Sequence, residues 1–159
     1  MSMQDINLKG KKKKIDWEGL YMKKLLPIHK NHSKKFFHRM MKKSSTLKSS
    51  LRKRSIEYEV EFKVSLTQLR KLLYKSYGRK CLYCDEILVV SNMVCDHVIP
   101  LSLGGGSVIK NLSIICGRCN TRKGPLTGKD YEDLLKSLSK LSEDTVKYVL
   151  RKLAKSEVF

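Results

Sequence analysis

Two Cys-x-x-Cys pairs, Cys81/Cys84 and Cys116/Cys119, constrain the fold of this chain more than any other feature of its sequence. A tetrahedral zinc ion takes four thiolates readily when each pair comes from one tight turn, so we expect a structural zinc. Free buried thiols and a redox-active pair are the alternatives. The 31 residues between Cys84 and Cys116 exceed the roughly 15–20 of a plain zinc ribbon, so additional structure must lie between the pairs. The fifth cysteine, Cys95, lies in an apolar run and reads as a small buried hydrophobic residue.

Length and charge narrow the class of protein. The chain has 159 residues, enough for one ordinary domain, and its 34 Lys and Arg against 15 Asp and Glu give a net charge of +19. The electrostatic field of so large a positive charge attracts polyanions. Nucleic acid is therefore the first partner to consider, before acidic membrane surfaces or acidic proteins. Residues 1–54 alone carry 17 Lys and Arg and three carboxylates. We therefore expect a basic, partly helical or disordered nucleic-acid-binding arm over 1–54, including Lys11, Lys12, Lys13 and Lys14, and a domain over 55–159.

The sequence has no run resembling a membrane span or a secretory signal. A span needs about 20 consecutive apolar residues, and the basic run near the N-terminus has no apolar segment behind it. We therefore expect a protein that is neither secreted nor membrane-bound. It would act in the cytoplasm, or in the host cytoplasm if a phage encodes it, where cysteines stay reduced.

Hydrophobic periodicity predicts the elements around the cysteines. Residues 55–64 alternate apolar and polar side chains, as in a strand with one buried face. Ser65 and Gln68 form a capping box that begins a helix of roughly three turns, which ends before Gly78. The apolar runs Leu88–Val90 and Met93–Ile99 favour a hairpin.

Helical patterns dominate the remainder of the chain. Residues 119–123 should form a short helix that stops at Gly124-Pro125. Two amphipathic helices follow over 130–155, the second capped by Ser142, and we expect them to pack on the zinc module.

The segment between the cysteine pairs and just after it contains an ordered set of polar and turn residues. In order they are Asp96-His97, Pro100, Gly104-Gly105, Asn111-Leu112, and Cys119-Asn120 followed by Lys123-Gly124. This string closely resembles the HNH endonucleases, the zinc-ribbon branch of the ββα-metal or His-Me finger nucleases, over residues 81–124. The resemblance implies an α+β fold. Its small ββα-metal core would hold a four-cysteine zinc, and the hydrophobic patterns add a strand and helix before this core and two C-terminal helices after it.

The same residues suit phosphodiester hydrolysis on chemical grounds. The reaction needs a base for water, a cation for the charge growing at phosphorus, and donors that hold the phosphate. An imidazole such as His97 is substantially neutral at cellular pH and can serve as the base, while Asp96 and Asn120 offer the hard oxygen ligands that Mg²⁺ prefers. Neighbouring strand residues point to opposite faces, so Asp96 and His97 require a distortion or a strand end to share one site.

The resemblance implies a role for each of these residues. His97 matches the family's general base, Asp96 and Asn120 its ligands for a single catalytic Mg²⁺ or Mn²⁺, and Asn111 the asparagine that braces the loop and helps orient the histidine. The family often has His where Asn120 stands, which leaves the choice of metal open, and many relatives have a basic residue at the position of Leu103. The alternatives give these residues structural roles only. Asp96 would be a carboxylate at a strand end, His97 a hydrogen-bonded histidine of the core, and the two asparagines caps of turns.

We therefore predict a metal-dependent DNA endonuclease that binds its substrate largely through phosphates. Arg118, Arg122 and Lys123 would steady the phosphate or simply form a solvated face. The alternative from another class is a non-catalytic zinc-ribbon protein that binds nucleic acid, and a thiol redox protein is a third reading. Several properties stay open: DNA against RNA, nicking against double-strand cleavage, sequence or structure specificity, and monomer against homodimer. The biological role is open as well, between a homing, restriction, packaging or toxin enzyme, although the composition suggests a phage or mobile element.

Overall fold

The computed structural model describes residues 34–155. The chain divides into two units, Met1–Phe37 and His38–Phe159, and the second holds the cysteines and the predicted site. Its elements are helices α2 (Lys34–Glu57, which begins in the first unit), α3 (Leu66–Ser76), α4 (Gly117–Lys123), α5 (Gly128–Leu138) and α6 (Glu143–Lys155), strands β1 (Met93–His97) and β2 (Leu112–Cys116), and 3-10 turns η1 (Leu101–Leu103) and η2 (Ile109–Asn111). This composition confirms the predicted α+β class. Among the residues described, no helix is long and apolar enough to cross a membrane.

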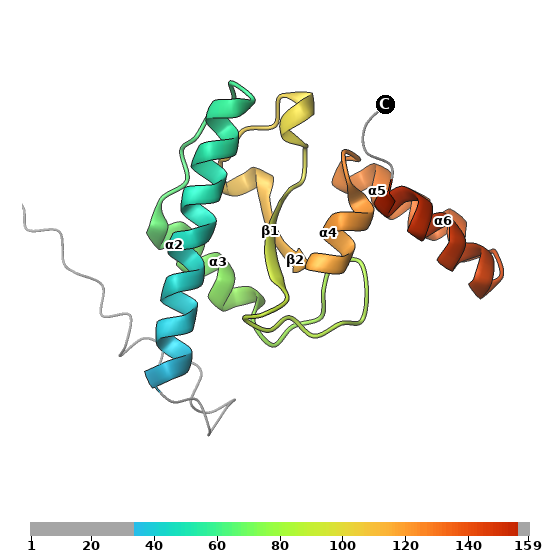
Figure 1. Cartoon of the computed structure of the whole chain (residues 1–159), viewed down its shortest axis with the longest axis horizontal. Coiled ribbons are helices and arrows are strands. Elements are labelled where there is room, and N and C mark those ends of the chain that lie inside the picture. The colour runs from blue at the N-terminus through green and yellow to red at the C-terminus, as the bar shows by residue number, and fades with distance from the viewer. Residues whose placement is uncertain (1–33, 156–159) are drawn as a thin grey trace, which may run out of the picture. The chain divides into compact units, whose positions relative to one another are not determined.

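The centre of the second unit is a two-stranded antiparallel hairpin of β1 and β2. The pairing runs from Met93 opposite Cys116 to His97 opposite Leu112. In Figure 1, α2 and α3 lie on one side of this hairpin and α4 on the other. Strand β1 ends at His97, directly after the Asp96-His97 step, and both residues still pair with β2.

The predicted hairpin between Leu88–Val90 and Met93–Ile99 is wrong, because β1 pairs with β2 instead. The first of the two runs has a different partner: Gly78 N–H donates to the Leu88 carbonyl, and Leu88 N–H donates to the Arg79 carbonyl. The backbone groups of Leu88 are thus satisfied by residues that precede Cys81. Apolarity indicated an extended segment, but could not indicate which segment it would pair with.

The helix after Ser65 forms as predicted. The Ser65 side chain accepts from Gln68 N–H and the Gln68 side chain accepts from Ser65 N–H, which completes the capping box of α3. Gly78, just past the end, has φ +75°, a left-handed conformation that favours glycine. Leu69 and Leu73 are buried on one face of α3, and this helix contacts β2.

The strand predicted over 55–64 is wrong. Helix α2 continues to Glu57, and the chain then turns at Glu59, whose φ is +53°. Only Phe62 forms a bridge, parallel to Ser107. The expected boundary between residues 54 and 55 therefore falls inside α2, whose Met40, Leu51 and Ser55 are buried. Only the first three residues of the alternating pattern, 55–57, belong to α2. Ser55 lies one helical turn after Leu51, and both residues are buried on the same face of that helix.

Helices α4 to α6 follow the predicted order. Thr127 caps α5 by accepting from Asp130 N–H, and the Ser142 hydroxyl accepts from Thr145 N–H at the start of α6. Tyr131 of α5 packs edge-on against Tyr83 between the first two cysteines, with ring centroids 4.9 Å apart. Helix α6 contacts α4. The C-terminal helices are thus packed on the cysteine module, as expected.

Candidate active site and zinc site

The four cysteines of the two pairs converge on one point. Their Sγ atoms all lie within 4.8 Å of one another, and the Cys84 and Cys116 sulfurs are 3.7 Å apart. A tetrahedral zinc with Zn–S bonds of about 2.3 Å separates its sulfurs by about 3.8 Å. The cluster is therefore positioned to bind a metal ion and fits a structural zinc, with all four positions filled by protein.

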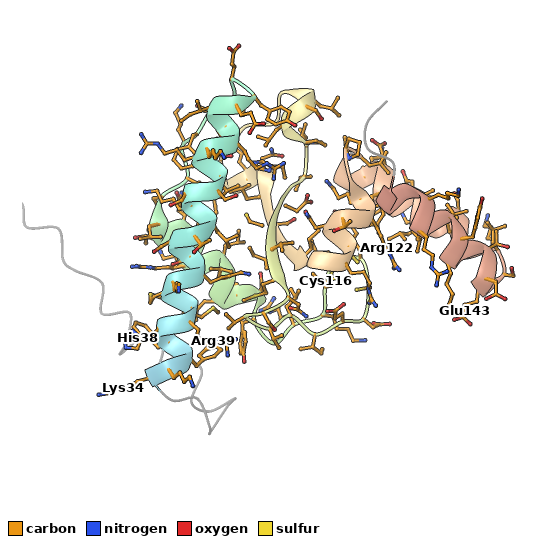
Figure 2. All side chains as sticks on the ribbon, in the orientation of Figure 1. Lys34, His38, Arg39, Cys116, Arg122 and Glu143 are labelled. Atoms are coloured by element: carbon orange, nitrogen blue, oxygen red, sulfur yellow. The ribbon has the colours of Figure 1, made fainter. Side chains whose placement is uncertain are left out.

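Backbone groups support this cluster. Cys116 N–H donates to the Cys81 sulfur and Cys119 N–H donates to the Cys116 sulfur, each at 3.4 Å. Cys116 lies where β2 meets α4 (Figure 2) and also caps that helix. Burial raises the pKa of the Cys116 thiol to about 11, so a metal has to displace its proton on binding. The cysteine cluster therefore sets where α4 begins.

A cavity of about 230 Å³ lies between α2, the end of β1 and α4. Its lining combines polar and charged side chains from segments far apart in the sequence: Arg54, Cys95, Asp96, His97, Pro100, Leu101, Asn120, Thr121, Lys123 and Gly124. Three of the four residues predicted to carry catalysis, Asp96, His97 and Asn120, thus line one cavity.

Asp96 is a buried carboxylate with one oxygen engaged and one unpaired. Its Oδ1 accepts from Lys123 Nζ at 3.1 Å, and the lysine also donates to the His97 carbonyl at 3.0 Å. Its Oδ2 has no hydrogen-bond partner among the described residues. Burial raises the pKa of Asp96, and the charges of Lys123 and Arg54 oppose that rise. An unpaired carboxylate oxygen, in a cavity that Asn120 also lines, suits a divalent cation that prefers oxygen ligands.

His97 is 4% exposed. Burial lowers its pKa to about 4, assisted by the positive charges of Arg54 and Lys123. The imidazole is therefore neutral at pH 7, the form that can accept a proton. Its Nε2 lies 2.9 Å from the Ser107 hydroxyl.

Asn111 braces the loop that follows β1, although it does not line the cavity. Its Oδ1 accepts from Ile99 N–H at 2.8 Å, and its Nδ2 donates to the carbonyls of Ile99 and Gly106, both at 3.0 Å. Gly105 packs so closely that a Cβ there would lie 1.9 Å from the Ile99 carbonyl oxygen. This arrangement agrees with the bracing role that the resemblance implies.

The predicted basic contacts fall in different places. Arg118 pairs with Glu86 at 3.2 Å and donates to the Cys84 sulfur at 3.8 Å, at the cysteine cluster. Lys123 is only 1% exposed and is bound to Asp96. Arg122 lies on α4 (Figure 2), and Lys11–Lys14 lie outside the described residues. A phosphate contact by any of these residues stays a prediction.

Sequence reasoning missed three residues of the site. Arg54 lines the cavity from α2, and the Ser107 hydroxyl links His97 to Ser55, 2.7 Å away. Helical spacing from Leu51 to Ser55 offered a signal, but the alternation that begins at Ser55 favoured a strand. Nothing in the sequence indicated that Ser107 would lie next to His97.

Comparison with known proteins identifies the central segment. Residues 81–131, about a third of the chain, match the family model described as HNH endonuclease. A search of curated proteins finds no match. The family implies a nuclease-type function on a nucleic acid substrate. The segment that carries the cysteine cluster, Asp96, His97 and Asn120 is thus similar to the HNH endonucleases, in agreement with the resemblance seen in the sequence.

Proposed function

We propose that this chain is a metal-dependent endonuclease that hydrolyses DNA phosphodiester bonds. The observation that carries the proposal is the meeting of Asp96, His97 and Asn120 in one cavity that Arg54 and Lys123 also line. A neutral base, two oxygen ligands and positive charge are what phosphodiester hydrolysis requires. A structural zinc ribbon alone would not need this combination beside it.

The chain's own residues supply the proton transfer. The His97 imidazole, neutral because its pKa is about 4, takes a proton from a water molecule in the cavity. The resulting hydroxide oxygen bonds to phosphorus as the bond from phosphorus to the 3′ oxygen breaks. The leaving oxygen takes a proton from solvent, so the products are a 5′-phosphate and a 3′-hydroxyl.

Asp96 and Asn120 are the residues that would hold the catalytic cation. The unpaired Oδ2 of Asp96 is the carboxylate atom left for it, since Lys123 occupies Oδ1. Bound Mg²⁺ or Mn²⁺ would supply positive charge at the leaving oxygen. The adjacent Lys123 ammonium fixes the carboxylate through an ion pair that is almost fully buried.

Positive charge extends from the cavity along α2, which supports a nucleic acid substrate. Residues 34–54 carry nine Lys and Arg and no acidic residue. Arg54, at the cavity, offers the planar guanidinium that binds phosphate by two parallel hydrogen bonds. We expect the other basic residues of the helix to contact flanking phosphates without reading sequence.

The test is cleavage of supercoiled plasmid DNA by the full chain of verified zinc content, with and without Mg²⁺. His97→Ala should reduce the cleavage rate at least about 100-fold because the base is lost. It should leave zinc content and DNA binding unchanged, since His97 is not among the clustered cysteines. His38→Ala, which alters an exposed histidine of α2 outside the cavity, is the matched control.

Magnesium is withheld rather than chelated in this assay, because a strong chelator would also remove zinc. If the wild-type protein binds DNA but cuts nothing with Mg²⁺ or Mn²⁺, the non-catalytic zinc-ribbon reading replaces this proposal. The ratio of nicked to linear product reports whether one strand or both are cut.

A further inference from the structure

Two serine hydroxyls lie behind His97 in a continuous hydrogen-bonded line. His97 Nε2 is 2.9 Å from Ser107 Oγ, and Ser107 Oγ is 2.7 Å from Ser55 Oγ. Both serines are buried, Ser107 at 0% exposure and Ser55 at 1%. Buried hydroxyls need partners, and here the partner at one end of the line is the predicted base.

The backbone on either side holds Ser107 in place. Ser107 N–H donates to the Glu61 carbonyl at 2.7 Å, and Lys63 N–H donates to the Ser107 carbonyl at 3.1 Å. The segment that follows α2 therefore binds both the N–H and the carbonyl of this serine. Ser55 is fixed in turn by its place in the helix itself. The backbone of both serines is therefore held in place beside the histidine.

We propose that Ser107 and Ser55 are positioning residues that hold His97 as its Nε2–H tautomer, with Nδ1 free of hydrogen toward the cavity. The inference rests on the proposed function for its catalytic consequence, but the tautomer itself is a separate property. A neutral imidazole carries one N–H, so hydrogen on Nε2 leaves the Nδ1 lone pair for the proton of water.

Hydrogen accounting shows why the second serine matters. Ser107 has one hydroxyl hydrogen. The two hydroxyls can be oriented in two ways. When the Ser107 hydrogen goes to Ser55 Oγ, Ser107 can only accept from His97, which requires hydrogen on Nε2; when Ser55 donates to Ser107, the Ser107 hydrogen goes to Nε2 and the histidine carries its hydrogen on Nδ1. A base that takes the proton of water at Nδ1 requires the first orientation, which is the one that we propose. Without the Ser55 oxygen, the Ser107 hydrogen is free to turn toward Nε2, and the histidine would then carry its hydrogen on Nδ1. That tautomer cannot take a proton at Nδ1.

Helix α2 therefore completes the site from outside the family match. Residues 81–131 contain His97 and Ser107, but Ser55 comes from α2 and the backbone partners of Ser107 come from residues 61 and 63. The family segment supplies the base, while the N-terminal helix controls which of its nitrogens is available.

The experiment measures the tautomer directly on the zinc-loaded full chain without Mg²⁺. Long-range ¹H–¹⁵N correlation spectra at neutral pH distinguish the two neutral forms of histidine, and the signals missing in His97→Gln assign this residue. Wild type should show the Nε2–H pattern. Ser55→Ala and Ser107→Ala should gain the Nδ1–H form, while Ser107→Thr, which keeps a hydroxyl, should retain the wild-type pattern.

Ser44→Ala is the matched control, because Ser44 is equally buried on α2 but donates to the Met41 carbonyl of its own helix. It should change neither the tautomer nor cleavage. Ser55→Ala should lower kcat about 10- to 100-fold with KM unchanged, as loss of a group that orients a functional histidine does elsewhere. Thermal melting and zinc content of each variant separate this effect from misfolding.

The outcomes distinguish the two proposals. A wild-type His97 in the Nδ1–H form, or tautomers unaltered by both alanine variants, would overturn the inference whatever the activity. A protein that shows the expected tautomers yet cleaves no DNA would refute the nuclease and still support the selection of Nε2–H. A fall in kcat in Ser55→Ala without a change of tautomer would count against this explanation.

Discussion

At the scale of single residues, the buried His97 makes stability depend on pH. Its pKa is lowered to about 4 by burial and then by the charges of Arg54 and Lys123, whereas an unfolded histidine titrates near ~6.5. Between these values the unfolded chain binds a proton that the folded protein does not. This contribution to stability is therefore complete above about pH 6.5 and is lost as pH falls toward 4, by up to about 3 kcal/mol.

Urea unfolding of wild type and His97→Gln at several pH values checks this expectation. The difference in unfolding free energy between the two proteins should shrink as pH falls from about 6.5 toward 4. A difference independent of pH over this range would show that the folded histidine titrates normally.

The ion pair of Lys123 and Asp96, with side chains 1% and 8% exposed, gives a second residue-scale prediction. Lys123→Met leaves a buried carboxylate without its cation and should destabilise the fold by about 3 kcal/mol or more. The double variant Lys123→Met/Asp96→Asn removes both charges and should recover most of that stability. The double variant should not cleave DNA, because it lacks the Asp96 carboxylate that would hold the catalytic cation. Equal stability of the single and double variants in denaturant unfolding would contradict the pairing.

At the scale of elements, the loop between β1 and η2 depends on close packing at Gly105. Gly105→Ala would place a Cβ 1.9 Å from the Ile99 carbonyl oxygen and 2.9 Å from Asn111 Nδ2, so the loop has to shift. We expect a loss of at least about 2 kcal/mol in stability and a matching loss of activity. Gly117→Ala, where the nearest atoms are 3.8 Å away, should be nearly neutral. A fully active Gly105→Ala protein would show that the loop does not position His97.

Sequence reasoning succeeded for elements whose signals are local. The capping box at Ser65 and the left-handed glycine at Gly78 depend on neighbours within one turn, and both are seen. The cysteines converge because each pair is a single knuckle. The strand partner of β1 and the true end of α2 were missed because both depend on contacts between residues distant in sequence.

The candidate site, too, was predictable only in part from the sequence. Asp96, His97 and Asn120 were predictable because their order matched a known pattern, and all three line the cavity. The contact between Ser55 and Ser107 spans 52 positions, and no periodicity encodes such a pairing. The burial of Lys123 was also missed, because a lysine at the end of a short helix usually faces solvent.

At the scale of the molecule, zinc should couple the fold to activity. The cysteine cluster fixes the start of α4, the helix that carries Asn120. Removing zinc should therefore lower the melting temperature and abolish cleavage together. Adding back Zn²⁺ with Mg²⁺ should restore both, whereas Mg²⁺ alone should restore neither. Retention of the wild-type melting temperature in metal-stripped protein would exclude a structural zinc.

The positive charge of the N-terminal residues also acts at the scale of the whole molecule, through the affinity for DNA. Residues 1–33 carry eight lysines and precede α2. Deleting them leaves α2 intact, whereas deleting residues 1–54 would cut through this helix. We expect weaker DNA binding with a shallower dependence on salt, by roughly 0.9 in log–log slope for each phosphate that the shortened protein no longer neutralises. Electrophoretic mobility shifts at several salt concentrations measure this slope. An unchanged slope would place every phosphate-binding residue after residue 33.

The position of Ser55 also bears on how the proposed nuclease could be moved into other proteins. A cassette cut at Cys81, where the family match begins, would leave the Ser107 hydroxyl without the oxygen now 2.7 Å from it. It would also remove Met40 and Leu51, two apolar side chains of α2 that are buried in the intact protein. A fusion built for targeted DNA cutting has to carry the chain from the start of α2 at Lys34 onward, so the transferable part is more than twice as long as the segment that matches the family.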